Sequence, residues 1–211
     1  IHFNFEKSPL CFKHPVSVIH CSSFQDVPRA FEKIEDALKQ GLHVAGFFSY
    51  ELGYAFEETF SSYSLNGFPL LYVGCYEKPQ RFKNQVFAGA HGSQINNLRF
   101  NLSKGKYGEH IDIIRSYLQS GDVYQITYCL KILFDFSGNA FDLYQKMFAV
   151  QPVPYAAFIE TETYSIASLS PELFLYKTGS SILSKPMKGT WERGKNFFSD
   201  IVARYQFCRD E

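Results

Sequence analysis

The chain has 211 residues, of which 45% are hydrophobic and 18% aromatic, so it is long enough to fold around a real core. Its 21 basic and 21 acidic residues cancel, which argues against an electrostatic nucleic-acid or membrane partner and favours a small metabolite as ligand. The 5 cysteines are odd in number, widely spaced and outside any CxxC motif, so they indicate neither a disulfide framework nor a zinc site. This pattern fits a reducing compartment, and we expect a cytoplasmic protein without a membrane span.

The first elements expected along the chain are one helix and two strands. Residues 28–41, "PRAFEKIEDALKQG", repeat apolar side chains at helical spacing and end on Gly41, which predicts an amphipathic helix with a glycine stop. Residues 43–56, "HVAGFFSYELGYAF", and residues 69–77, "PLLYVGCYE", predict strands. The turn-rich "SSYSLNGFP" separates these two strands.

The middle of the chain predicts a helix, a long strand and a shorter helix. Residues 106–121, "KYGEHIDIIRSYLQSG", repeat the helical spacing and again end on a glycine, Gly121. In residues 124–136, "YQITYCLKILFDF", apolar and polar side chains largely alternate, which predicts a half-buried strand. Residues 140–150, "AFDLYQKMFAV", predict the second helix.

Four short strands with the turn spacing of a meander are expected next. They cover residues 154–161, 164–170, 172–177 and 181–185. The fold class that follows is α+β, with mostly antiparallel β-sheets packed with helices. No repeat or clear linker divides the sequence, so we treat residues 1–211 as part of one domain without an internal boundary.

A glutamate and a lysine stand out at the end of this meander. Glu172 begins "ELFLY", and Lys188 lies in "KPMKGT" after the next strand. Strands joined by the turn "KTGSS" would place the start of one opposite the end of the other, which would make these residues neighbours. A carboxyl beside an amine can divide the acid and nucleophile roles of a reaction. The same two residues can equally form an ordinary cross-strand salt bridge, worth about 0–1 kcal/mol.

The order of several sequence blocks resembles the chorismate-utilising enzymes, the family of anthranilate synthase and aminodeoxychorismate synthase large subunits. The blocks are "AGFFSYELGYAFEE", "SGDVYQITY", "PVPYAAFI", "SLSPELF" and "KPMKGTWERG", and they follow one another in the family's order. The resemblance covers nearly the whole chain. It implies an anthranilate-synthase-component-I-like fold, incomplete at the C-terminus.

One position in the last block distinguishes branches of that family. Anthranilate synthases typically carry Ala where this chain has Lys188. The variant with Lys resembles aminodeoxychorismate synthase component I, the 4-aminobenzoate synthase large subunit, which makes 4-amino-4-deoxychorismate for folate biosynthesis. By this resemblance Lys188 is the covalent nucleophile and Glu172 the acid that protonates the departing hydroxyl. Gly189 and Thr190 would bind a substrate carboxylate, although a plain turn after a strand is the alternative for these two residues.

The resemblance also implies the substrate, a partner and a cofactor. These are chorismate, a glutamine amidotransferase subunit that supplies ammonia, and Mg²⁺. The family's metal-binding glutamates lie in a part of the domain that would follow Glu211, so no metal ligand is expected in this chain. We therefore expect a truncated chain, the N-terminal part of one chorismate-binding catalytic domain, inactive by itself.

Two other functions remain open. The chain could belong to another chorismate-utilising enzyme, of the anthranilate or isochorismate synthase type, although Lys188 argues against it. It could also be a non-catalytic truncated paralogue that acts only in binding. A smaller departure from the family is Leu173, where the family often has Arg.

Overall fold

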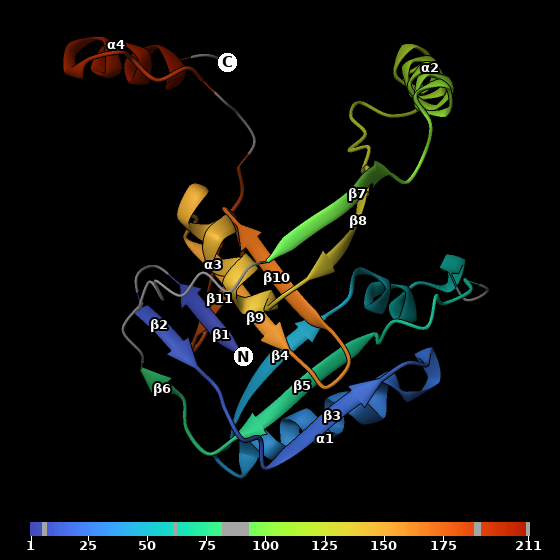
Figure 1. Ribbon diagram of the computed structural model, residues 1–211, viewed down its shortest axis with the longest axis vertical. Coiled ribbons are helices and arrows are strands. Elements are labelled where there is room, and N and C mark those ends of the chain that lie inside the picture. The colour runs from blue at the N-terminus through green and yellow to red at the C-terminus, as the bar shows by residue number, and fades with distance from the viewer. Residues whose placement is uncertain (6–7, 61–62, 82–92, 188–190, 210–211) are drawn as a thin grey trace. The chain divides into compact units, whose positions relative to one another are not determined.

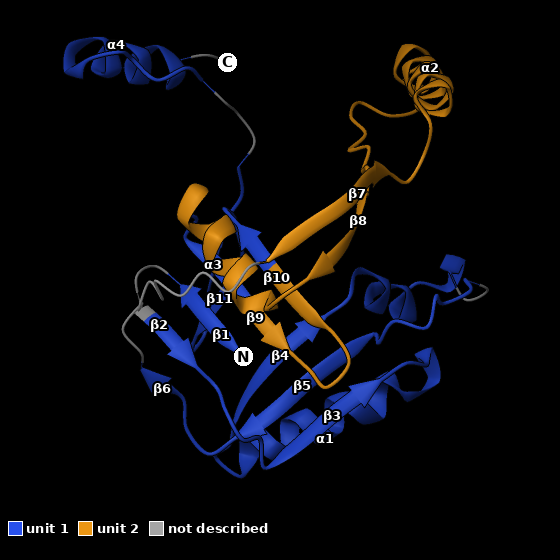
Figure 2. Ribbon diagram, viewed as in Figure 1, with its two compact units in different colours: residues 1–82, 152–157, 168–211 blue, residues 83–151, 158–167 orange. Residues whose placement is uncertain are grey.

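The computed structural model describes residues 1–5, 8–60, 63–81, 93–187 and 191–209 (Figure 1). Its helices and strands group into two compact units (Figure 2). Unit 1 comprises residues 1–82, 152–157 and 168–211, and unit 2 comprises residues 83–151 and 158–167.

A three-stranded antiparallel sheet with one helix forms the packed part of unit 1. Its strands are β3 (Ser17–Cys21), β5 (Leu71–Tyr76) and β4 (His43–Phe48), in the order β3-β5-β4. Helix α1 (Val27–Lys39) contacts β3 and β4. A smaller hydrophobic cluster contains Phe12, Ala45 and Tyr76. The main cluster of buried side chains comprises Ile19, Cys21, Val27, Ala30, Ile34, Ala37, Leu52, Leu70, Leu71, Val73 and Cys75.

Helix α1 forms where its apolar spacing predicts it. Its buried residues Val27, Ala30, Ile34 and Ala37 lie on one face and join the core cluster. Gly41, with φ of 81°, follows the helix end, in a backbone conformation that favours glycine. The helix predicted over residues 28–41 is therefore confirmed.

A second sheet combines strands that are far apart in the sequence. It has the order β10-β9-β1-β2-β6, where β1 is His2–Phe5, β2 is Ser8–Cys11 and β6 is Gln80–Arg81. Strands β9 (Tyr155–Glu160) and β10 (Ser165–Ser170) are those predicted over residues 154–161 and 164–170. Each of these two strands contributes residues to both units.

Unit 2 contains an antiparallel strand pair and two helices. The strands are β7 (Gln94–Phe100) and β8 (Ile132–Ser137), and the helices are α2 (Lys104–Ser120) and α3 (Ala140–Val150). Each helix is capped at its start. The side chain of Ser103 accepts a hydrogen bond from a backbone N–H in the first turn of α2, and that of Asn139 does the same for α3. Gly121, with φ of 80°, ends α2. The two helices predicted in the middle of the chain are therefore confirmed.

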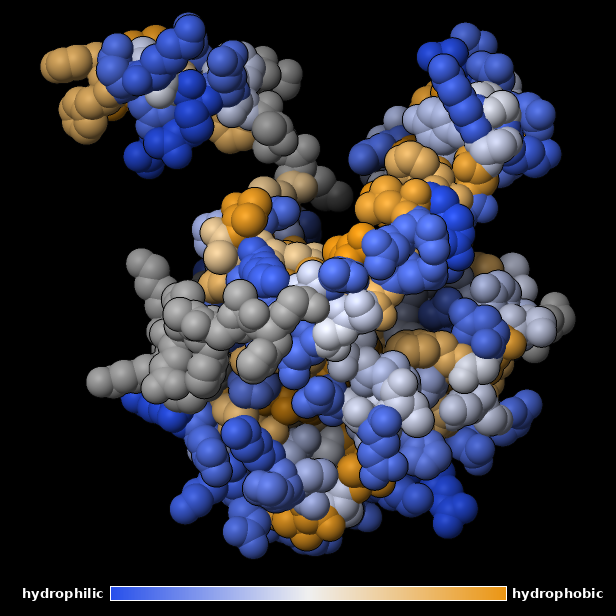
Figure 3. Space-filling model, viewed as in Figure 1, coloured by the Kyte–Doolittle hydropathy of each residue, from blue (hydrophilic) through white to orange (hydrophobic). Residues whose placement is uncertain are grey.

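The C-terminal part of unit 1 consists of a hairpin and a helix. Strands β11 (Leu173–Thr178) and β12 (Ser181–Lys185) pair antiparallel, as predicted. Their tight turn contains Gly179 with φ of 58°. Helix α4 (Phe197–Phe207) follows and exposes large apolar side chains, visible as apolar surface in Figure 3. The exposed apolar residues of its first turns are Phe197, Phe198, Ile201 and Val202.

The strand predicted over residues 43–56 is wrong in its second half. Strand β4 ends at Phe48, and the 3-10 helix η2 (Tyr50–Phe56) follows. The N–H of Leu52 donates to the carbonyl of Ser49 at 3.2 Å, and the Leu52 side chain is buried in the core cluster. A turn that buries Leu52 therefore replaces the strand. A second short 3-10 helix, η3, covers Glu58–Phe60.

The long strand predicted over residues 124–136 is wrong in its first half. Regular strand structure begins only at Ile132, because β7 pairs with residues 132–137 and its last residue, Phe100, pairs with Ile132 itself. Among the described residues no strand pairs with the preceding stretch, and Tyr124 is 92% exposed. Alternation of apolar and polar residues is therefore not sufficient to form a strand where no neighbouring strand is available for pairing.

The predicted fold class is confirmed, since the chain combines helices with antiparallel sheets. The assignment of residues 1–211 to one catalytic domain stays a prediction. Of the helices that the structure describes, none combines the length and the apolar character needed to cross a bilayer.

Candidate functional site

The β11–β12 hairpin determines where Glu172 lies. Leu173, the first residue of β11, pairs with Lys185, the last residue of β12. A register shift between Leu173 and Tyr176 leaves one more residue on β11 than on β12 in this interval, as in a β-bulge. Glu172 directly precedes this end of the ladder, and the chain leaves β12 through Pro186. The start of one strand therefore lies opposite the end of the other, as the sequence predicts.

A local turn fixes the backbone of Glu172. The N–H of Glu172 donates to the Ser170 hydroxyl at 3.2 Å, and the same hydroxyl donates to the Glu172 carbonyl at 3.0 Å. The residue is exposed, and its carboxylate forms no ion pair with any side chain in the described ranges. A carboxylate on a fixed backbone at the rim of a hairpin is accessible to a ligand.

The other predicted site residues, Lys188, Gly189 and Thr190, lie outside the described residues. The residues on either side of them, Met187 and Trp191, both line one hollow of about 470 Å³. The remaining lining residues are Glu192, Arg193, Asp200, Ala203, Arg204 and Phe207. The hollow therefore adjoins the "KPMKGTWERG" block on both sides of Lys188.

An ion pair links this block to the first turn of α4. Arg193 Nε donates to Asp200 Oδ1 at 2.5 Å, and Arg193 Nη2 donates to Asp200 Oδ2 at 2.5 Å. These hydrogen bonds from Arg193 lower the pKa of the Asp200 carboxyl, and the same contact raises the pKa of Arg193. The two groups are therefore held in their charged forms.

Gly194 packs directly against the backbone of α4. Its N–H donates to Asp200 Oδ1 at 3.0 Å. A Cβ atom at Gly194 would lie 2.1 Å from the backbone nitrogen of Asp200 and 2.2 Å from the carbonyl carbon of Ser199. Only glycine fits here, because backbone atoms of a helix cannot move aside as a side-chain end can.

The sequence reasoning missed both α4 and the Arg193–Asp200 pair. A usable signal for the helix was present: Asn196 and Ser199 form a capping box, a spacing that marks a helix start. The ion pair had no comparable signal. Arg193 and Asp200 become partners only because α4 begins between them.

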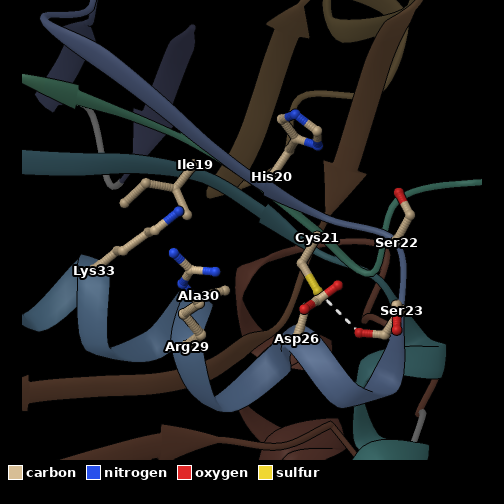
Figure 4. Close-up of a pocket in the computed structure, with 9 residues that line it drawn as sticks. All are labelled: Ile19, His20, Cys21, Ser22, Ser23, Asp26, Arg29, Ala30 and Lys33. Atoms are coloured by element: carbon tan, nitrogen blue, oxygen red, sulfur yellow. Dashed lines mark hydrogen bonds between the residues drawn. The ribbon is translucent and has the colours of Figure 1, made fainter.

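A second hollow, of about 490 Å³, lies between β3 and the first turns of α1 (Figure 4). Its lining includes the cationic side chains of Arg29 and Lys33 and the thiol of Cys21, which donates to the Ser23 carbonyl at 3.1 Å. Glu172 does not line it, nor does any described residue of β11 or β12.

The described residues do not form a metal centre. No three His, Cys, Asp or Glu side chains within the described ranges come together in a group that could hold a metal ion. The described residues therefore supply no ligand group of that size for a metal ion, and Mg²⁺ stays a prediction.

Comparison with known proteins gives one family and several relatives. A family model described as chorismate binding enzyme matches residues 13–211. The chain is 33% identical over 95 residues to the aminodeoxychorismate synthase component 1 of Klebsiella aerogenes, covering 45% of this chain and 21% of the relative. It is 33% identical over 105 residues to the Bacillus subtilis protein of the same name, covering 50% of this chain and 22% of the relative.

An anthranilate synthase component 1 is also similar. The protein from Thermus thermophilus is 28% identical over 110 residues, which cover 52% of this chain and 24% of the relative. Each match thus spans about a fifth to a quarter of the relative's own length.

Proposed function

The chain belongs to the chorismate-binding enzyme family, and from this membership we propose that it acts as an aminodeoxychorismate synthase component I. The proposed reaction is amination of chorismate to 4-amino-4-deoxychorismate, with ammonia from a glutamine amidotransferase partner. The partner proposal is supported by relatives named as component 1 of this synthase.

The observation that carries this proposal is Lys188 in "KPMKGT". The resemblance described above associates lysine at this position with amination at the hydroxyl-bearing carbon, and alanine with anthranilate synthesis. The hairpin register adds support, because Glu172 lies at the end of the ladder from which the chain continues to Lys188. The similarity to anthranilate synthases supports an enzyme of that type as the second candidate.

In the proposed first step, the neutral amine of Lys188 forms a bond to a ring carbon of chorismate. The ring double bond shifts, and the allylic C–O bond breaks. Glu172, acting as general acid, gives its proton to the departing hydroxyl, which leaves as water. A covalent lysine adduct and a glutamate carboxylate result.

In the second step, ammonia forms a bond to the carbon that carried the hydroxyl. The double bond shifts back, and the bond to Lys188 breaks, so that the lysine amine leaves with its electron pair. The new ammonium group gives one proton to the Glu172 carboxylate, which restores the acid. Chorismate and ammonia have then become 4-amino-4-deoxychorismate and water.

The lysine must be neutral to attack. At an ordinary lysine pKa of about 10.4, only about one amine in a few thousand is unprotonated at pH 7. The proposed site therefore has to lower the pKa of Lys188, through apolar neighbours or a nearby cation. Mg²⁺ is proposed as a cofactor that would neutralise a substrate carboxylate. A cytoplasmic location is part of the same proposal.

The test compares Lys188→Ala and Lys188→Arg in the intact natural protein, supplied with chorismate, ammonia and Mg²⁺. A covalent nucleophile predicts that both variants lose most of kcat while chorismate binding stays close to normal, because the lost bond forms only beyond the ground state. Intact-mass analysis of protein quenched with chorismate, without ammonia, should show an adduct that both variants lack.

Lys177→Ala is the matched control, since Lys177 is an exposed lysine of β11 in the same hairpin. It should keep the activity and the adduct. Near-normal turnover by Lys188→Arg, together with no adduct on the unmutated protein, would show that Lys188 only holds a negative charge. Formation of anthranilate instead of 4-amino-4-deoxychorismate would favour the second candidate.

A further inference from the structure

We propose that Arg193, Gly194 and Asp200 form a positioning device that fixes the C-terminal side of the "KPMKGTWERG" block to the first turn of α4. The inference rests on the proposed function, because it assigns these residues a role in holding the segment that carries Lys188. None of the three residues is proposed to touch the reacting atoms.

The first component is the forked contact between Arg193 and Asp200. Both carboxylate oxygens accept a hydrogen bond from the guanidinium, each at 2.5 Å. A planar guanidinium that meets a carboxylate in this way restricts the orientation of both side chains, which a lysine ammonium cannot do. The contact therefore sets a direction as well as a distance.

The second component is Gly194, whose main chain packs directly against the backbone of α4. Its N–H adds a hydrogen bond to the carboxylate that Arg193 already holds, at 3.0 Å from Asp200 Oδ1. The space that a Cβ would need is occupied by the helix backbone at Ser199 and Asp200. The main chain, rather than a flexible side chain, is thus attached to the helix.

The helix turn that receives these contacts is itself fixed. The Asn196 side chain accepts from the N–H of Ser199 at 3.0 Å, and the N–H of Asn196 donates to the Ser199 hydroxyl at 3.0 Å. The N–H of Asp200 donates to the Asn196 carbonyl at 2.9 Å. Asp200 is therefore presented from a capped helix start, whose partial positive charge also favours a carboxylate.

The other side of the block is attached to the hairpin. Strand β12 ends at Lys185, which pairs with Leu173 beside Glu172. The segment that carries Lys188 thus begins at a strand end and finishes at a helix start. Met187 and Trp191, the described residues nearest Lys188 on each side, line the same hollow.

The pair is too exposed to act mainly as a source of stability. The Arg193 side chain is 86% exposed and that of Asp200 30% exposed. Exposed ion pairs contribute little to folding free energy because water screens them. A reaction rate is far more sensitive to the position of a reacting group, since a misplacement of about 1 Å can lower the rate about 100-fold. Loss of the pair should therefore affect turnover more than folding.

The first experiment measures kcat and KM of the intact natural protein with Arg193→Lys and with Asp200→Asn. We expect kcat to fall about 10- to 100-fold in both variants, with KM for chorismate changed less than about threefold. Arg115→Lys is the matched control, because Arg115 pairs with Asp112 by one exposed contact of 3.4 Å in α2.

A second experiment uses the same protein and needs no activity. Trypsin cleavage after Lys188, followed by mass spectrometry, should become several-fold faster in Asp200→Asn than in the unmutated chain. Asp112→Asn should leave this rate unchanged. Unchanged cleavage and unchanged kcat in the Asp200 and Arg193 variants would overturn the positioning role. If cleavage becomes faster in Asp200→Asn but the unmutated protein does not aminate chorismate, the proposed function is rejected, while the structural role of Arg193, Gly194 and Asp200 is supported.

Discussion

The sheet β3–β5–β4 with α1 and the hairpin β11–β12 belong to the same unit, yet different interactions hold them. Leu71 and Cys75 of β5 and Val27 of α1 are 0% exposed in the first region, and they belong to one hydrophobic cluster. In the hairpin, Phe174 is 82% and Ile182 66% exposed. Side-chain burial holds the sheet, whereas backbone pairing and turn geometry hold the hairpin.

The contacts that stabilise the fold therefore differ from those that position the candidate site. Glu172 and the ends of the "KPMKGTWERG" block depend on the ladder of β11 and β12 and on polar contacts at the start of α4. These contacts bury little apolar surface. Substitutions in the sheet should therefore change the free energy of unfolding, and substitutions around the site should mainly change local geometry.

The largest expected effect is from Leu71→Ala in β5. Leu71 is fully buried, so the substitution removes apolar contacts and leaves a cavity, and the free energy of unfolding should fall by about 2–5 kcal/mol. Urea denaturation followed by far-UV circular dichroism measures the change.

Phe174→Ala in β11 is the matched comparison. It deletes a larger apolar side chain, but one that is 82% exposed, and should change the free energy of unfolding by no more than about 0.5 kcal/mol. A loss at Phe174 as large as that at Leu71 would show that the hairpin is packed in solution, and the contrast between the two regions would disappear.

A smaller effect is expected from Gly179→Ala in the hairpin turn. Gly179 has φ of 58°, which costs a residue with a Cβ about 1 kcal/mol, so the hairpin should be destabilised by about that amount. Amide hydrogen exchange of β11 and β12 should become faster, while β5 stays protected.

Gly105→Ala in α2 is the control for this turn. Gly105 has no positive φ and no atom within 4 Å of an added Cβ, so alanine should leave the chain as stable or slightly more so. Equal effects of the two substitutions would mean that the Gly179 conformation is not needed for the hairpin.

Elements with a complete local signal could be predicted from the sequence. Residues 28–41 and 106–121 combine helical spacing with a glycine stop, and both form helices. The hairpin was predictable because two short strands flank a turn that contains Gly179. The short turn sets the register as far as the Tyr176–Leu183 pair, and a shift beyond that pair places Leu173 opposite Lys185. The end of the hairpin at which Glu172 lies was therefore predictable, but the exact pairing beside it was not.

Features that depend on a distant partner could not be predicted. Residues 124–131 alternate as a strand does, but β7 ends before it can pair with them. The core takes Leu52 from a 3-10 helix where a strand was expected. Arg193 and Asp200 are likewise partners only through the start of α4. Periodicity indicates which apolar side chains share a face of an element, whereas tertiary contacts determine which strand or core residue they pack against.

The smallest effect concerns the pH response of the polar contacts at α4. Hydrogen bonds from Arg193 hold the pKa of Asp200 below its ordinary value of 3.8. A depressed pKa means that the contact contributes stability above pH 3.8, and that this contribution is lost as the pH falls through the pKa of the folded state. Titration of the Asp200 carboxyl carbon by NMR should therefore give a midpoint below 3.8, and Arg193→Gln should move that midpoint upward. Amide exchange at the start of α4 should accelerate over the same acid range, whereas β5, held by apolar burial, should show no such step. A midpoint at or above 3.8 in the unmutated chain would mean that the forked contact does not persist in solution, and that the start of α4 is held by its capping box alone.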